Sequence, residues 1–419
     1  MKLLIVTQYF WPENFPINDL VAGLVDRGHR VTVFTGRPNY PGGRLFDGYG
    51  PVRPWRETHA GASVVRVPLV PRGAGGGVRL FVNYLSFAVA GAALGPLVVP
   101  KDIDAIFVYE PSPISVGIPA MALKAVTGAP VLFWLQDLWP ESLSATGAIT
   151  ASWALKTVEM MVRLLYKGCD RILVQSRAFI PAVRRLGGAP DRIRYFPNNA
   201  DTLYRPVTVR AGAPERRLMP NGFRLTFAGN VGAAQDFDTI IGAAERLRDR
   251  EDIHFVIIGD GRMHHRVTRA VARKSLTRTV HLLGRYPADR MPTFFALSDA
   301  LLVSLRSDPI FSISIPSKVQ AYMACGRPIV AALDGEGARI IETAGAGLVC
   351  PTQSPARLAE TVRAMAGLSE TARQAMGNNG RRFFEAEFER EMLIDRLEGW
   401  IGTLTSGTGR QSNTGKTSP

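Results

Sequence analysis

The stretch 224–229, RLTFAG, decides the fold, because an alternation of apolar strands and helix-length segments begins there for a second time. Short apolar runs separated by amphipathic segments are typical of parallel sheets with helices on both faces. The sequence therefore predicts two successive α/β domains, each a doubly wound parallel sheet. The expected strands are LLIVT from residue 3, VTVFT from 31, SVVRV from 63, AIFVY from 105, VLFWL from 131, RILVQ from 171, RLTFAG from 224, HFVIIGDG from 254, VHLLG from 280, ALLVSL from 300 and PIVAAL from 328.

The length of 419 residues exceeds what one hydrophobic core usually organises, which agrees with two domains. We expect an N-terminal domain over 1–200 and a C-terminal domain over 201–382, entered through the polar, basic linker 201–222. Aromatic and aliphatic residues at helical spacing predict a last helix over 383–404. The tail 405–419 is of low complexity, which predicts disorder.

The formal net charge of +14 predicts an anionic partner. The arginines are spread along the chain without a basic run or an aromatic stripe, which argues against nucleic acid as that partner. The three cysteines are far apart and have no metal-ligand spacing, so we expect no metal site and a reducing, cytoplasmic location. The first residues, MKLLIVTQYFWPEN, lack a cleavage site and predict a strand, not a signal peptide.

One stretch, 80–99, is uncharged and nearly long enough to span a membrane. Asn83 and the Gly95-Pro96 pair argue against a span. We expect a helix that packs on its own domain and touches the bilayer through aromatic side chains.

Two loops of the N-terminal domain carry carboxylates. Glu13 lies in TQYFWPENFPIND, a rigid polar-aromatic loop that suits a carbohydrate, or that packs its own aromatics. Asp137 and Glu141 lie in WLQDLWPESL, where Asp137 could orient or deprotonate a sugar hydroxyl, or cap the next helix. The absence of a G-x-G-x-x-G turn after the first strand argues against a dehydrogenase.

Glycine turns follow the first two strands of the C-terminal domain. Glycines allow a close approach of backbone, and a helix N-terminus that follows can receive a phosphate. An arginine beside the second turn could pair with that phosphate or be solvated. The candidate binding residues of these turns are Gly229, Asn230, Gly232, Gly259, Gly261 and Arg262.

The stretch 313–330, ISIPSKVQAYMACGRPIV, predicts a helix between a loop and a strand. Ser317 and Lys318 would then stand at the positive N-terminus of that helix, which outlines an anion site; a solvated lysine beside a cap is the alternative. In the later turn GEG, Glu336 could accept a hydroxyl of a ribose or sugar, next to Gly337. Together these turns predict a site for a nucleoside diphosphate.

The motifs, taken in order, resemble family 4 glycosyltransferases with the GT-B fold, and most closely the WbuB-type fucosamine transferases of bacterial surface-polysaccharide synthesis. The resemblance covers about residues 1–405. It rests on the following motifs: YFWPE near the start, RGHRVTVFTGRPNYPGG at 27–43, QDLWPES at 136–142, FAGNVG at 227–232, GDG at 259–261 and PSKVQAYMACGRPIV at 316–330.

The resemblance implies two facing Rossmann-like domains with a cleft between them and no cofactor or metal. It also implies a nucleotide-sugar donor, taken here as UDP-linked, held mainly by the C-terminal domain, and a last helix that crosses back to the N-terminal domain. For this subgroup it implies a polyprenyl-diphosphate saccharide acceptor at the anionic inner face of the plasma membrane. The enzyme would be peripheral, on the cytoplasmic side, and would retain the anomeric configuration.

Two features depart from the family pattern. Ile313 and Ala321 stand where most members have the glutamates of an E-x7-E motif, and Asn230 and Gln235 stand where an Arg and a Lys are usual. On physical grounds we therefore expect Lys318, Arg262 and Glu336 to take the place of the usual phosphate-binding cations and ribose-binding carboxylate.

The leading hypothesis is sugar transfer, with Lys318 stabilising the leaving diphosphate and Asp137 or Glu13 acting on the acceptor. The alternatives are a GT-B nucleotide-sugar epimerase, which needs no acceptor, and a non-catalytic membrane scaffold with a degenerate donor site.

Overall fold

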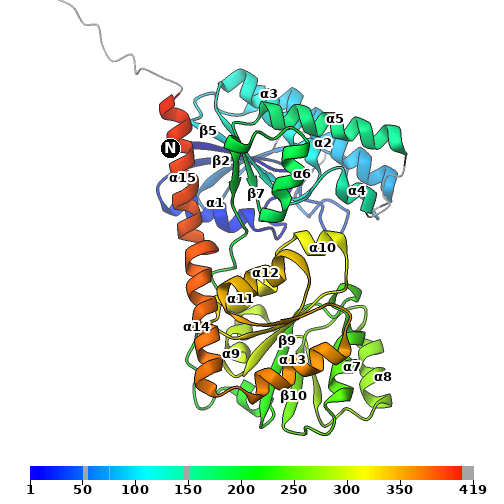
Figure 1. Ribbon diagram of the computed structural model, residues 1–419. Coiled ribbons are helices and arrows are strands. Elements are labelled where there is room, and N and C mark those ends of the chain that lie inside the picture. The colour runs from blue at the N-terminus through cyan, green and yellow to red at the C-terminus, as the bar shows by residue number, and fades with distance from the viewer. Residues whose placement is uncertain (51–54, 75, 146–150, 408–419) are drawn as a thin grey trace, which may run out of the picture. The chain divides into compact units, whose positions relative to one another are not determined.

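The computed structural model describes residues 1–50, 55–74, 76–145 and 151–407 (Figure 1). The chain divides into two compact units. The N-terminal unit contains Met1–Pro197 together with the chain from Arg390 onward, and the C-terminal unit contains Asn198–Glu389. Each unit is a mainly parallel sheet flanked by helices, so the predicted fold class of two doubly wound α/β domains is confirmed.

The sheet of the N-terminal unit has the order β3-β4-β2-β1-β5-β6-β7-β8. All neighbouring strands are parallel except β3, which runs antiparallel to β4. Its strands are β1 (Lys2–Val6), β2 (Arg30–Gly36), β3 (Trp55–His59), β4 (Ala62–Val67), β5 (Ala105–Glu110), β6 (Val131–Leu135), β7 (Arg171–Val174) and β8 (Ile193–Tyr195). Its helices are α1 (Ile17–Asp26), α2 (Gly77–Val98), α3 (Gly117–Thr127), α4 (Glu141–Ala145), α5 (Ser152–Gly168), α6 (Ile180–Arg185) and α15 (Arg390–Gly407).

The sheet of the C-terminal unit is parallel throughout, in the order β11-β10-β9-β12-β13-β14. Its strands are β9 (Phe223–Ala228), β10 (Ile253–Ile258), β11 (Val280–Gly284), β12 (Ala300–Ser304), β13 (Ile329–Ala332) and β14 (Gly347–Cys350). Its helices are α7 (Phe237–Arg246), α8 (His264–Arg273), α9 (Met291–Ala296), α10 (Pro309–Ile313), α11 (Ser317–Ala324), α12 (Gly335–Ala344), α13 (Pro355–Gly367) and α14 (Glu370–Glu387).

The strand order reverses direction once in each sheet, between β1 and β5 and between β9 and β12. The central strands β5 and β6 are buried at every residue, because helices cover both faces of the sheet. Polar chemistry is thereby excluded from the strands and moved to the loops at their C-terminal ends, where open α/β sheets bind ligands.

All the strands expected from the sequence are present, and three further strands were missed. Strand β3, WRETH, is a mostly polar edge strand, so it lacks the apolar run that marks a covered strand. The other two, β8 and β14, are short edge strands. Strand β8 lies at the edge of its sheet opposite β3, and β14 lies at the edge of its sheet opposite β11; both have few fully buried residues.

The stretch 201–222, expected to be a linker, packs on the C-terminal unit. Tyr204 stacks on Phe295 with ring centroids 6.1 Å apart, and the buried Glu215 pairs with Arg290. Proline and charge in this stretch therefore mark an ordered extension of the unit and not a free connection.

The expected single helix over 383–404 is divided, because α14 ends at Glu387 and α15 begins at Arg390. Of the tail predicted to be disordered, residues 405–407 still belong to α15, and the rest lies outside the described residues.

Helix α15 packs on α1 within the N-terminal unit. Ile394 and Leu397 are completely buried in the same core as Leu24. Gly23 of α1 allows this approach, since a β-carbon there would lie 2.6 Å from Ile394 Cδ1. At the rim, Arg27 Nε donates to Glu391 Oε2 at 2.9 Å. The C-terminal helix thus completes the core of the N-terminal unit.

Replacing Ile394 by Ala is expected to reduce the free energy of unfolding of the N-terminal unit by about 2–5 kcal/mol, since it leaves a cavity against α1. Denaturant unfolding monitored by circular dichroism measures this loss. Thr403→Ala, at an exposed position of the same helix, is the control and should change stability by less than about 0.5 kcal/mol. Equal losses of unfolding free energy in both variants would show that the buried contact between α1 and α15 does not stabilise the unit.

Candidate functional site

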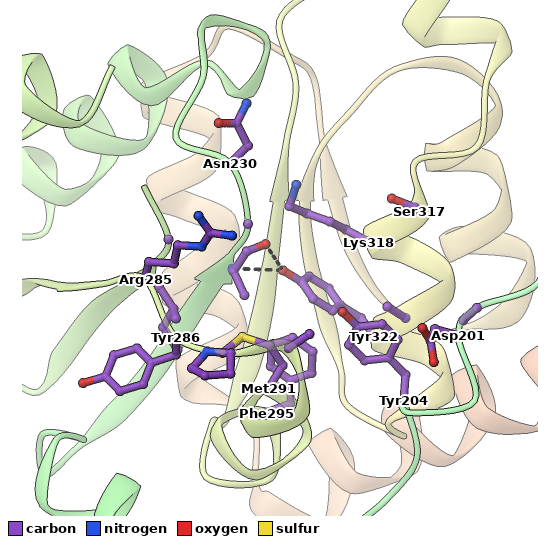
Figure 2. A pocket seen from close by; sticks show the side chains of 18 of the residues that line it. Asp201, Tyr204, Asn230, Arg285, Tyr286, Met291, Phe295, Ser317, Lys318 and Tyr322 are labelled. Atoms are coloured by element: carbon purple, nitrogen blue, oxygen red, sulfur yellow. Dashed lines mark hydrogen bonds between the residues drawn. The ribbon is translucent and has the colours of Figure 1, made fainter. Parts of the chain in front are cut away.

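A pocket of about 1150 Å³ opens in the C-terminal unit at the C-terminal ends of β9 and β10 (Figure 2). The loops after β9, β10 and β11, the first turn of α11 and the segment from Asn199 form its walls. The lining residues are Asn199, Ala200, Asp201, Tyr204, Ala228, Gly229, Asn230, Ile258, Gly259, Asp260, Gly261, Arg285, Tyr286, Pro287, Ala288, Met291, Phe295, Ser317, Lys318, Ala321 and Tyr322.

One wall of the pocket is bare backbone. Gly229 and Gly259 have φ values of 136° and 145°, which favour glycine. A β-carbon on Gly259 would lie 1.8 Å from the carbonyl oxygen of Gly229, and one on Gly261 would lie 2.4 Å from Asn230 Oδ1. The two loops are joined by a hydrogen bond from Val231 N to Asp260 O at 2.9 Å. A ligand can therefore approach the peptide groups of this wall closely.

Lys318 supplies the positive charge of the pocket. Its side chain extends from α11 toward the loop after β9 (Figure 2), and its Nζ donates to Gln235 Oε1 at 3.1 Å and lies 5.0 Å from the ring centre of Phe227. Burial lowers the pKa of Lys318 to about 8. Within the described part of the chain no carboxylate pairs with this ammonium group, so an anionic ligand would supply the missing counter-charge.

The first turn of α11 adds to this positive potential. Pro316 adopts extended backbone just before the helix, and Val319 N donates to Pro316 O at 2.9 Å. The backbone N–H groups of Ser317 and Lys318 have no acceptor within the helix, because they lie in its first turn, and the helix dipole is positive at this end. Tyr322, fully buried one turn later, holds the helix on β9 because its hydroxyl accepts a hydrogen bond from Ala228 N at 3.2 Å.

A smaller pocket of about 210 Å³ shares Ser317 and Lys318 with the large one. Its walls include Gln235, Phe311, Ser314 and Pro316. Because Lys318 lines both pockets, a charged group beside it could connect a ligand portion in the large pocket with one in the small pocket.

The structure brings most of the predicted donor-site residues together. Those that line the large pocket are Gly229, Asn230, Gly259, Gly261, Ser317 and Lys318, and those that do not are Gly232, Arg262, Glu336 and Gly337.

The residues left outside have local roles or face solvent. Arg262 is exposed. Glu336 is buried and accepts two hydrogen bonds from Arg339, at 2.7 and 2.8 Å, and a β-carbon on Gly337 would meet Pro316. Glu336 therefore has a cationic partner already and does not reach the pocket, contrary to our expectation of a hydroxyl acceptor there.

Several lining residues were missed in the sequence. Arg285 and Tyr286 directly follow β11, so the rule that ligands bind at C-terminal strand ends could have found them. The stretch 201–222 was taken as a linker, which hid Asp201 and Tyr204. Figure 2 shows the Arg285 guanidinium pointing toward the pocket across from Lys318.

Glu13, predicted to act on an acceptor, lies in the N-terminal unit with its carboxylate held by backbone amides. Oε1 accepts from Asn39 N and Tyr40 N, both at 2.8 Å, and Oε2 accepts from Phe10 N at 3.2 Å. Burial raises the pKa of Glu13 to about 7, against the effect of these amides. Glu13 thus fixes the loop around Tyr40 against the loop after β1.

The aromatic side chains of that first loop contact one another. Tyr9 stacks on Phe15 with centroids 5.1 Å apart, and Trp11 stacks on His59 at 4.3 Å. This supports the alternative that the loop packs its own aromatics. Trp139, in the loop after β6, is buried, and its ring centroid lies 6.5 Å from that of Tyr84.

Asp137 follows β6 and is half-buried. Its Oδ1 accepts from Leu138 N at 2.9 Å and from the hydroxyl of Ser142, in the first turn of α4. Burial raises the pKa of Asp137, while these hydrogen bonds oppose the shift. The carboxylate thus holds the turn that leads into α4, and Oδ1 carries both of these bonds. Among the described residues, no group of His, Cys, Asp and Glu side chains is arranged to hold a metal ion.

Two protein families match the chain in succession. Residues 17–199 match the family described as glycosyl transferase 4-like domain, and residues 222–367 match the glycosyl transferases group 1. The first match ends at residue 199, just past the end of the N-terminal unit at Pro197, and the second lies within the C-terminal unit.

Curated relatives agree with these matches. The chain is 25% identical over 289 residues to the probable glycosyltransferase WbjE of Pseudomonas aeruginosa, covering 68% of this chain and 71% of that protein. It is also 25% identical over 338 residues to the putative colanic acid biosynthesis glycosyl transferase WcaI of Escherichia coli K12, covering 78% and 82%. Among solved structures, Anabaena Alr3699/HepE in complex with UDP superposes with a TM-score of 0.69 at 15% identity, over 96% of this chain and all of that one. This likeness shows the fold.

Lys318→Gln is expected to weaken binding of inorganic pyrophosphate about tenfold to a hundredfold, because it removes a charge-assisted hydrogen bond. In the wild type, affinity should fall as the pH rises above about 8, since the free protein then loses the Lys318 proton that the anion needs. Isothermal titration calorimetry from about pH 7 to about pH 9.5 measures both effects.

The matched control is Arg262→Gln, which removes one exposed charge outside the pocket. It should leave the affinity within about threefold of the wild type. An equal loss in the two variants would mean that net charge alone, and not the pocket, attracts the anion.

Proposed function

Since the chain belongs to the glycosyltransferases, with a 4-like domain followed by a group 1 domain, we propose that it transfers a sugar from a nucleoside-diphosphate donor to a lipid-linked saccharide. Of the two curated relatives, WcaI is described as a putative colanic acid biosynthesis glycosyl transferase, whereas WbjE is described only as a probable glycosyltransferase. The proposed product is a bacterial surface polysaccharide, such as an exopolysaccharide or the saccharide of a lipopolysaccharide.

The observation that carries this proposal is the half-buried ammonium group of Lys318 at a glycine-lined pocket, which no carboxylate of the described residues pairs with. The diphosphate of the donor would lie between Lys318, the α11 amides and the backbone of Gly229 and Gly259. The nucleoside would fill the large pocket near Arg285, and the sugar the smaller one. This places the strongest positive potential where negative charge develops on the leaving diphosphate.

The proposed donor is UDP-linked, in line with the UDP and UDP-glucose bound to the HepE structures. The proposed sugar is a deoxysugar of the N-acetylfucosamine type, which follows from the resemblance of QDLWPES and PSKVQAYMACG to the WbuB-type transferases. The small pocket is lined by Phe311 and Pro316 as well as polar groups, which suits a sugar with an apolar methyl group.

The N-terminal unit would bind the acceptor, and Asp137 would receive its proton. The acceptor hydroxyl oxygen forms a bond to the anomeric carbon, the bond from that carbon to the diphosphate oxygen breaks, and the electron pair leaves with the diphosphate. The hydroxyl proton passes to Asp137 or to the leaving phosphate. We propose retention of the anomeric configuration and no metal ion, with Lys318 in place of a metal as the counter-charge.

The lipid acceptor fits an apolar surface of the N-terminal unit, which we call the apolar helix face. Helix α2 is long and apolar enough to cross a membrane by length and composition, but Asn83, Phe87 and Gly91 bury one side of it in the unit. Its opposite side is exposed. The large apolar side chains exposed on this face are Val78, Phe81, Val82, Leu85, Val89 and Leu97 of α2, with Trp153, Met160 and Leu164 of α5.

Both α2 and α5 contact α3, so they cover the same side of the sheet (Figure 1). Lys156, Arg163 and Lys167 lie among the exposed residues of α5. Apolar side chains rimmed by cations match the inner leaflet of a plasma membrane, which is anionic. We therefore propose a peripheral enzyme on the cytoplasmic side, whose polyprenyl-diphosphate acceptor lies in that leaflet.

UDP-sugars are expected to raise the unfolding temperature of the C-terminal unit by a few degrees at a hundredfold excess over Kd, while Lys318→Ala abolishes this rise. Differential scanning fluorimetry with a panel of UDP-, GDP- and dTDP-sugars identifies the base. Absence of any shift in folded wild-type protein contradicts the donor site.

Asp137→Asn is the complementary variant, because it leaves the C-terminal unit intact. It should keep the donor-induced shift and lower transfer to a polyprenyl-diphosphate saccharide by about 10²- to 10⁴-fold. Full transfer activity in this variant would remove Asp137 from the reaction.

Leu85→Glu combined with Leu164→Glu is expected to weaken binding to phosphatidylglycerol-containing vesicles by tenfold or more, since two buried-in-lipid leucines are each worth about 2 kcal/mol. Vesicle co-sedimentation at two salt concentrations measures this, and binding of the wild type should weaken with salt. Leu218→Glu, an exposed leucine of the C-terminal unit, is the control and should bind as the wild type does. Equal binding by the double variant rules out the apolar helix face.

A further inference from the structure

A wholly buried carboxyl group lies behind Asp137 and has no role so far. Glu110 is the last residue of β5, and its side chain is inaccessible to solvent. Ala105, Phe107 and Tyr109 of the same strand join the core that includes α1 and α15. Since side chains alternate along a strand, Glu110 points to the opposite face, which α3 covers. Among the described residues, neither oxygen of its carboxyl group has a hydrogen-bond partner with good geometry, although the amides of Gln136 and Asp137 lie near enough to favour its charged form.

The titratable neighbours of Glu110 are Asp137, Tyr166 and Tyr109. Gln136 N donates to the backbone oxygen of Glu110 at 3.0 Å, which brings the adjacent Asp137 close to the Glu110 side chain. Tyr166 of α5 is buried, its hydroxyl has no hydrogen-bond partner among the described residues, and its pKa is raised by burial and then by the charges of Glu110, Glu141 and Asp137. Burial first, and then the charge of Glu110, also raise the pKa of Tyr109 of β5.

These surroundings favour the neutral form of Glu110. A buried carboxylate without hydrogen bonds loses the hydration of its charge, and a second carboxylate nearby adds repulsion. Burial first, and the charge of Asp137 second, raise the pKa of Glu110 well above its usual range, although the amides of Asp137 and Gln136 oppose this. Asp137 differs, because it is half-exposed and accepts two hydrogen bonds that stabilise its charge.

We propose that Glu110 is a positioning residue for Asp137: it keeps its proton at neutral pH, so that the single negative charge of this carboxyl pair lies on Asp137. The inference rests on the proposed function for the role of Asp137 as proton acceptor, but not for the protonation of Glu110. A second charge beside Asp137 would raise the basicity of Asp137 and force it to hold a proton before any acceptor arrives. The neutral neighbour therefore keeps Asp137 free to receive the acceptor proton.

The first test needs no substrate. Glu110→Gln replaces a neutral acid by a neutral amide of the same shape. The folded wild type holds the Glu110 proton at pH values where the unfolded chain loses it, so wild-type stability falls as the pH rises above about 4.3, the ordinary pKa of glutamate. Glutamine has no such proton. The variant should therefore match the wild type near about pH 4.5 and unfold at a temperature several degrees higher near about pH 8.

Glu141→Gln is the control for this measurement, because Glu141 is a neighbouring carboxylate that pairs with Arg185. The difference in unfolding temperature between Glu141→Gln and the wild type should not increase with pH. If Glu110→Gln instead shows no gain over the wild type as the pH rises, or loses stability relative to it, Glu110 is ionised in the folded protein and the inference is wrong. If Glu110→Gln does not fold, Glu110→Met, a neutral side chain of similar length, takes its place in the same pH series.

The second test addresses catalysis. The acid limb of the pH profile of kcat/KM reports the ionisation of Asp137. Replacing a neutral Glu110 by neutral glutamine adds or removes no charge beside Asp137, so it should leave the pH of this limb unchanged. A displacement of the limb to lower pH would show that Glu110 carries charge while Asp137 titrates. If no transfer is detected with any acceptor, the proposed function fails while the stability result still decides the state of Glu110.

Discussion

The chemistry of the C-terminal unit depends on the interaction of the Lys318 ammonium group with an anion, because no carboxylate of the described residues pairs with this group. The ammonium group contacts an amide oxygen of Gln235 and the ring of Phe227, both neutral, and its pKa is lowered by burial. A charge in this position costs free energy until an anion arrives. The glycines at the ends of β9 and β10 make that arrival possible, since any side chain at Gly259 would collide with the Gly229 carbonyl.

Parallel topology explains why this charge lies where it does. Strands covered on both faces have no room for polar side chains, so polar groups gather at the C-terminal ends of the strands. In the C-terminal unit these groups include the backbone amides of glycine turns, Lys318 and Arg285. In the N-terminal unit they include Glu13 and Asp137, so the proposed reaction assigns the leaving anion to the C-terminal unit and the proton acceptor to the N-terminal unit.

The three carboxylates of the N-terminal unit show how environment separates identical groups. Glu13 is tied by three backbone amides and organises loops. Asp137 is half-exposed, with a hydroxyl and an amide on one oxygen. Glu110 is fully buried, and its carboxyl oxygens have no well-aligned hydrogen-bond partner in the described part of the chain. Only the second of these environments suits a group that exchanges a proton with a substrate.

The same comparison shows what sequence reasoning can supply. Apolar runs and glycine turns located the strands and the wall formed by Gly229, Asn230, Gly259 and Gly261, because strand burial and positive φ leave a local signature. Arg262 and Glu336 were chosen by residue type and place beside turns. The structure shows Arg262 exposed and Glu336 paired with Arg339, and it shows Arg285 at the pocket instead.

The sequence by itself determined the two α/β domains, their order and the loops that carry polar residues, since the period of apolar residues depends on neighbours along the chain. Only the tertiary structure decided which polar groups are charged, paired or accessible. Lys318 meets Gln235 from 83 residues away, and Glu110 is isolated by helices that follow it in the chain. Burial and hydrogen bonding depend on such distant contacts, and so does the free energy of every charge.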